Sequence, residues 1–102
     1  MDITVGSKRH GDAGEYIGRP SVLGNPYRPA PGKPGSTQVM YEAWLKGEIA
    51  AGNEAVIAEL KRLGALAEEG ELTLVCWCRP MPCHGDVIKR ALEEHWYEAT
   101  AE

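Results

Sequence analysis

A chain of 102 residues with 43% apolar side chains has enough hydrophobic material for one compact core, so a single domain over residues 1–102 is expected. No apolar run approaches the roughly 20 residues that cross a bilayer, and residues 1–5 do not resemble a signal peptide, which predicts a cytoplasmic protein with no membrane partner. Residues 1–40 carry five basic and three acidic side chains, whereas residues 41–102 carry six and twelve. The net charge of -4 makes duplex nucleic acid an unlikely partner, but a small anionic ligand suits the basic N-terminal groups.

The first 36 residues predict two short strands followed by a long loop. Residues 3–5 and 15–17 have a strand-like composition, and residues 11–14, which begin and end with glycine, favour a turn between them. Residues 18–36 are rich in glycine and proline, and loops of that length in compact domains tend to be functional or disordered. The side chains expected to anchor this loop to the core are Ile17, Val22, Leu23 and Tyr27.

Two helices are expected in the middle of the chain. Ser36 is placed to cap the first helix, and Asn53 to cap the second, which Gly70 would end. The apolar face expected for the first helix consists of Val39, Met40, Ala43 and Trp44. The stripe expected for the second consists of Val56, Ile57, Leu60, Leu63 and Ala67.

A strand over residues 71–75 and a helix over residues 87–92 complete the chain. Both faces of the strand are largely apolar, which is typical of a strand covered on two sides. The helix would turn four apolar side chains inward, namely Val87, Ile88, Ala91 and Leu92. The order of these elements predicts an α/β fold, a single small Rossmann-like layered domain with a mostly parallel sheet.

All three cysteines lie between that strand and that helix, in residues 76–83, and the sequence His-Gly-Asp follows at residues 84–86. Prolines at positions 80 and 82 lack the N–H that a strand ladder needs, so pairing should end near Cys78. The short loop would deliver Cys83 and His84 to the first turn of the helix. Unpaired backbone N–H groups and the helix dipole favour an anion there.

One interpretation of this segment is covalent or acid/base catalysis. The thiolate of Cys83 would be stabilised by the helix dipole and by Arg79, which would make it a nucleophile. His84 or His10 would be the general base, and Asp86 would cap the helix or orient a histidine. These groups suit a hydrolase or a transferase.

A second interpretation is a zinc site. Cys78, Cys83 and His84, completed by Cys76 or His10, would form a tetrahedral set. The spacing C-x-C-x4-C-H is, however, tighter than the C-x2-C of common zinc sites. A structural alternative treats Cys76 as a small core residue at the end of the strand, and for this one cysteine the structural interpretation is preferred.

The loop over residues 18–27 contains a second group of candidate binding residues. Gly18 and Gly24 permit close backbone approach, and the planar fork of Arg19 suits phosphate or carboxylate. Ser21 and Asn25 add neutral hydrogen-bonding groups. The same residues are also compatible with an ordinary turn. If the fold brings this loop to the Cys/His segment, the two would form a pocket for a phosphorylated ligand.

These motifs resemble a known family. Residues 8–11 read K-R-H-G, residues 16–27 read Y-I-G-R-P-S-x-L-G-N-P-Y, and residues 76–88 read C-W-C-x-P-x-P-C-H-G-D-V-I. Together they are similar to the bacterial and phage proteins catalogued as domain of unknown function 4326. The resemblance implies a stand-alone intracellular protein and says little about activity. The matching positions are Gly18, Arg19, Gly24, Asn25, Pro26, Cys78, Cys83, His84 and Asp86, without assigned roles.

The expected function is therefore the binding of a small anionic, nucleotide-derived ligand at the start of the last helix, in a hydrolase or a transferase. The alternative is a non-catalytic module, stapled by zinc, that binds a host protein or nucleic acid. The sequence makes no prediction of the oligomeric state.

Overall fold

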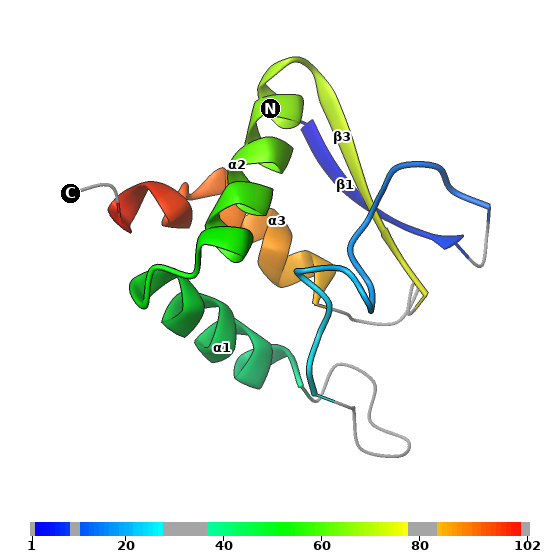
Figure 1. The fold of residues 1–102 in the computed structure, drawn as a ribbon. Coiled ribbons are helices and arrows are strands. Elements are labelled where there is room, and N and C mark those ends of the chain that lie inside the picture. The colour runs from blue at the N-terminus through cyan, green and yellow to red at the C-terminus, as the bar shows by residue number, and fades with distance from the viewer. Residues whose placement is uncertain (1, 9–10, 28–36, 78–83, 101–102) are drawn as a thin grey trace.

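The computed structural model describes residues 2–8, 11–27, 37–77 and 84–100 (Figure 1). The elements follow the predicted order of strands and helices, and the chain has an α/β fold. They are β1 (Asp2–Ser7), β2 (Glu15–Tyr16), α1 (Gln38–Ala50), α2 (Glu54–Glu68), β3 (Glu71–Cys76), α3 (Gly85–Glu93) and the 3-10 helix η2 (Trp96–Thr100). Within these described residues, no helix is both long enough and apolar enough to cross a membrane.

The sheet is parallel and has β3 at its centre, in the order β1-β3-β2. β1 pairs with the whole of β3, from Asp2 opposite Glu71 to Ser7 opposite Cys76. β2 pairs only with Leu74 and Val75, and the backbone N–H of Ile17 donates to the carbonyl of Val75 at 3.0 Å. Because all three strands point the same way, the segments that follow them leave the sheet at the end where the strands finish. We call this end, marked by the last residues of the three strands, the carboxyl edge.

A tight turn after β1 sends the chain towards β2. Gly11 lies at φ 77°, in the left-handed region that glycine tolerates best, and its N–H donates to the carbonyl of Lys8. The carboxylate of Asp12 accepts a hydrogen bond from the backbone N–H of Ser7 at 2.8 Å, and Asp12 N–H returns a bond to Ser7. In Figure 1 the chain after this turn runs back from the far end of the strands towards the start of α1.

The apolar face predicted for α1 is wrong except at Trp44, which is partly buried and packs against the core. The buried side chains are Tyr41, Leu45 and Ile49, whereas Val39 is 82% exposed and Met40 is 47% exposed. The sequence of α1 contains two apolar stripes, and the buried stripe extends along all three turns while the predicted one stops at Trp44. A stripe that spans the whole helix removes more apolar surface from water.

The other helices match their predictions. The side-chain oxygen of Asn53 caps α2 by accepting from the N–H groups of Ala55 and Val56 at 3.1 and 3.3 Å. The expected stripe of α2 is buried apart from Ile57, which is partly buried, and all four expected side chains of α3 are buried. Thr37 occupies the N-cap position of α1, and the predicted cap, Ser36, lies outside the described residues.

Candidate ligand-binding site

Both predicted motifs begin at the carboxyl edge of the sheet. The loop over residues 18–27 follows β2, and the Cys/His segment follows β3, so both begin at this edge. Lys8, which directly follows β1, lies at this edge too. It is exposed, and its ammonium lies 5.5 Å from the centre of the Tyr16 ring. Ligands of open parallel α/β sheets bind outside the carboxyl ends of the strands. The topology thus places both candidate motifs where such sheets hold their ligands.

A hydrogen bond from His84 joins the two motifs. Its Nε2 lies 2.7 Å from the carbonyl oxygen of Ile17, a residue 67 positions earlier, and the His84 side chain is 5% exposed. A carbonyl oxygen only accepts, so Nε2 is the nitrogen that bears the hydrogen. In the neutral ring Nδ1 is then an acceptor. His84 therefore fastens the start of α3 to the start of the loop.

Tyr41 of α1 holds the same junction from a third element. Its ring meets the His84 ring edge-on, with centroids 5.0 Å apart and an interplanar angle of 67°. Its hydroxyl donates to the carbonyl of Leu23 at 2.7 Å, and burial raises the pKa of this hydroxyl, which keeps it a neutral donor. Tyr41 was not among the candidate residues. The only signal for it was a tyrosine within an apolar helical stripe.

Two further contacts bind the first turns of α1 and α3 to the loop and to each other. The Asn25 amide donates to Thr37 Oγ1 at 2.9 Å, and its carbonyl oxygen accepts from the N–H of Tyr27 at 2.9 Å. The Gln38 amide donates to a carboxylate oxygen of Asp86 at 3.2 Å. Both ends of the Asn25 amide are thus engaged by the protein itself, so a contribution to loop geometry is the role that its contacts describe.

The two glycines of the loop make close contacts within the protein. A Cβ at Gly18 would collide with the ring of Tyr16, whose hydroxyl donates to the Arg19 carbonyl at 2.7 Å. A Cβ at Gly24 would lie 3.0 Å from the Cα of Arg19. Successive bonds from Ser21 N–H to Gly18 and from Gly24 N–H to Ser21 coil the segment. The absence of side chains at these glycines therefore allows the loop to pack on itself around Arg19.

The surroundings of His84 favour the neutral form of its imidazole ring. Burial lowers the pKa of His84, and the positive charge of Arg19 acts in the same direction. The Ile17 carbonyl, Cys76 and Asp86 oppose this shift without overcoming it. Arg19 itself is exposed. Ser21 Oγ is buried and has no hydrogen-bond partner within the described part of the chain.

Four predicted site residues, His10, Cys78, Arg79 and Cys83, lie outside the described residues. Cys76 is 1% exposed and belongs to the hydrophobic core, which confirms the burial expected for that cysteine. Within ranges 2–8, 11–27, 37–77 and 84–100, no group of three or more His, Cys, Asp or Glu side chains is arranged to hold a metal ion.

Trp77, which was not among the candidate residues, also lies at this edge. It directly follows β3 and is 52% exposed, which is unusual for so large an apolar ring. The signal was present in the sequence, because a tryptophan placed just after a buried strand and before a loop lies at the rim of the sheet. An exposed ring at this position offers a flat apolar face beside the candidate site.

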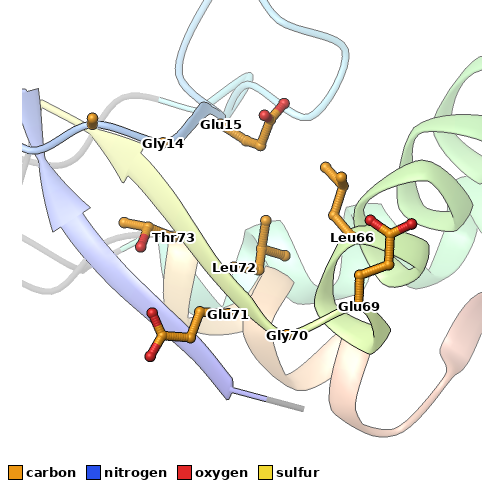
Figure 2. A pocket seen from close by; sticks show the side chains of 9 residues that line it. Gly14, Glu15, Leu66, Glu69, Gly70, Glu71, Leu72 and Thr73 are labelled. Atoms are coloured by element: carbon orange, nitrogen blue, oxygen red, sulfur yellow. The ribbon is translucent and has the colours of Figure 1, made fainter.

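A depression of about 460 Å³ lies at the opposite, amino edge of the sheet. Its lining comes from the start of β2, the start of β3 and the end of α2, and Figure 2 shows Leu66 of α2 and Glu69, which directly follows α2, on the side opposite Glu15. Glu15 pairs with Arg62 at 2.8 Å. None of the predicted site residues lines this depression.

The fold and site define a small α/β protein in which the loop after β2 meets the start of α3 at the carboxyl edge of a parallel sheet. The family model for domain of unknown function 4326 matches residues 4–94, so the chain belongs to this family. Both motifs lie inside the matched span, and η2 lies beyond it. Comparison with curated proteins and with solved structures finds no match.

Proposed function

We propose that the protein binds a small anionic, nucleotide-derived ligand at the carboxyl edge of the sheet. The hydrogen bond between His84 and Ile17 supports this proposal most directly, because it brings the loop that carries Arg19 against the start of α3. A guanidinium beside a helix N-terminus is a common arrangement for holding phosphate.

Three positive features serve the anion. Arg19 is exposed and Lys8 follows the end of β1 at the same edge, while the first N–H groups of α3 receive no side-chain cap from His84. A charged hydrogen bond contributes about 1.5–3 kcal/mol and a helix dipole about 0.3–1 kcal/mol. One charged hydrogen bond together with the helix dipole corresponds to an affinity of about 1 mM or weaker for phosphate alone. A physiological ligand needs additional contacts.

The exposed ring of Trp77 is suited to supply one such contact. Stacking of a base on an aromatic side chain contributes about 1–3 kcal/mol. Trp77 follows the central strand and therefore leaves the sheet at the same edge as the Arg19 loop. A ligand with a base as well as a phosphate would use both groups, which favours a nucleotide over a simple anion.

The binding proposal is tested by an NMR titration with adenosine 5′-phosphate. Arg19→Gln should weaken binding by about 10-fold or more, the equivalent of one lost charged hydrogen bond. Arg62→Gln is the matched control, because it removes the same charge at the amino edge, where Arg62 pairs with Glu15 and Glu59. Equal affinities for the two variants, or no binding by the wild type at millimolar concentration, would contradict the proposal.

A catalytic version of the proposal makes Cys83 the nucleophile of a hydrolase or transferase, and it competes with the zinc-stapled module. The two differ in their thiol chemistry. A metal-free protein with one rapidly reacting thiol supports catalysis, whereas stoichiometric zinc with unreactive thiols supports the module. Cys83→Ser should retain the melting temperature in the first case and lose the fold in the second. His84 is constrained in either case, because only its Nδ1 is free of the Ile17 bond.

A further inference from the structure

The side of α1 that faces solvent is apolar along the length of the helix. Val39 is 82% exposed and Met40 is 47% exposed. Ala43, Gly47 and Ala50 follow on the same side at helical spacing and are exposed as well. We call these five residues the outer face of α1. The opposite side of α1 is already buried in the core, and a helix buried on one side normally presents charged residues on the other.

α2 shows the composition expected of a helix surface in contact with water. Its exposed residues include Glu54, Lys61, Arg62 and Glu68, spread over the whole helix. The outer face of α1, in contrast, contains no charged side chain, and Figure 1 shows α1 at the periphery of the fold. A continuous apolar surface on an exposed helix is typical of a contact with another molecule.

A fixed pair of opposite charges borders the outer face. Lys46 Nζ lies 3.0 Å from one carboxylate oxygen of Glu42, one helical turn earlier, and Arg90 lies 2.8 Å from the other. The Lys46 ammonium also lies 4.7 Å from the centre of the Trp96 ring. These contacts hold both charges beside the apolar residues, and the Lys46 side chain is still 54% exposed. A partner surface should therefore place a cation opposite Glu42 and an anion opposite Lys46.

α1 of a second copy of the chain meets both requirements. When two copies of α1 lie antiparallel about a two-fold axis, Glu42 of each faces Lys46 of the other. A parallel pair would instead bring like charges together, which is unfavourable. Ala43 and Gly47 would lie near the centre of the antiparallel pair, where their small size lets the two helices approach closely.

We propose that the protein forms a two-fold symmetric dimer through the outer faces of two antiparallel α1 helices. A helix of this length is about 20 Å long. One such face is smaller than the roughly 800 Å² that each partner buries in a standard interface, so the dimer is weak, with a dissociation constant on the order of 10–500 µM. Tyr41 holds the candidate site from the buried side of α1, so the interface leaves that site uncovered. The inference is independent of the proposed function.

Sedimentation velocity from about 10 µM to about 1 mM, in a reducing buffer that prevents disulfides between chains, measures the association. Ala43→Glu places a charge at the centre of the apolar contact and should raise the dissociation constant about 10-fold or more. Ala58→Glu is the matched control, because it makes the same change at an exposed position of α2 and should leave the constant unchanged. Amide NMR spectra verify that both variants fold. A wild type that is monomeric at 1 mM, or equal association of the two variants, overturns the proposal.

Cross-linking tests the antiparallel arrangement. An equimolar mixture of ¹⁴N-labelled and ¹⁵N-labelled protein is treated with a carbodiimide, which joins a lysine to a carboxylate in contact with it without a spacer. Mass spectrometry should find a mixed-isotope link between Lys46 and Glu42, which only a contact between two chains can give. A dimer whose mixed-isotope links all lie outside α1 overturns the proposal.

Discussion

The two edges of the parallel sheet differ in charge and in how their side chains are arranged. At the carboxyl edge, hydrogen bonds join three separate elements through His84 and Tyr41, and the exposed charges there include Arg19. At the amino edge, the depression has carboxylates at Glu15 and Glu69 and no comparable network among its lining residues. A depression of this size is a common mark of a binding site, so the amino edge has to be considered as well. Polar groups from distant segments converge at the carboxyl edge, which favours that edge as the site. The carboxylates of the amino edge would repel an anionic ligand.

The largest expected contrast between the edges is in stability. Tyr41→Ala removes a fully buried ring and should lower the free energy of unfolding by about 3–5 kcal/mol. Leu66→Ala, in the half-buried wall of the amino-edge depression, should cost only about 1 kcal/mol. Urea denaturation of both variants measures the difference. Equal losses would show that the carboxyl-edge junction is no more tightly packed than the depression.

A finer test isolates the hydrogen bond of Tyr41 from its ring. Tyr41→Phe keeps the ring but leaves the carbonyl of Leu23 without its donor, which should cost about 1–3 kcal/mol. Tyr16→Phe is the matched control, because its hydroxyl also donates to a loop carbonyl at 2.7 Å but in an exposed position. That variant should change stability by about 0.5 kcal/mol or less. Similar costs would mean that burial does not distinguish the two bonds.

The sequence predicted those elements whose signal is local. The cap at Asn53 and the apolar stripes of α2 and α3 follow from residues within a few positions of one another. The face of α1 could not be predicted in this way, because two apolar stripes overlap and only the surrounding core decides between them. Likewise, the bond of His84 to Ile17 depends on β3 lying between β1 and β2, a pairing of distant segments that periodicity does not encode.

The chemistry of the side chains was enough to choose the candidate residues from the sequence. Their roles could be assigned only from their positions in the structure. The sequence identified His84 and the glycines of the loop, but it could not assign which ring nitrogen meets Ile17 or what the glycines contact. Gly18 was interpreted as room for a ligand, whereas its neighbour in the structure is the ring of Tyr16. Arg19 is the loop residue for which the sequence interpretation and the exposed position agree most directly.

The third prediction concerns pH and the carboxyl edge alone. The folded pKa of His84 is lowered by burial, whereas the unfolded ring keeps its ordinary value of 6.5. Above that pH the ring is neutral in both states and the stability is unaffected. Below it the unfolded chain binds the proton first, so stability falls as pH decreases towards the folded pKa, by up to about 1.4 kcal/mol per pH unit.

The measurement is urea denaturation between pH 7.5 and 5 in chelator-containing buffer, for the wild type and for His84→Gln. Other groups titrate in both proteins, so the quantity to compare is the difference between their stabilities. That difference should shrink as pH falls below 6.5. A difference that stays constant over this range would mean that His84 takes up its proton equally in the folded and unfolded chain, and the neutral Nε2–H tautomer would lose its support.

The smallest effect is expected at the amino edge. Arg62 bonds to Glu59 and Glu15 at 2.7 and 2.8 Å, but its side chain is 50% exposed, and surface ion pairs contribute only about 0–1 kcal/mol. Glu15→Gln should therefore lower stability by less than about 1 kcal/mol at low salt, with the loss vanishing in high salt. Chemical denaturation at two ionic strengths checks this. A larger, salt-independent loss would mean that the ion pair of Glu15 with Arg62 anchors the two-residue strand β2 and, through it, the start of the Arg19 loop. In that case a change at the amino edge would alter the structure of the carboxyl edge, and the two edges would not be independent.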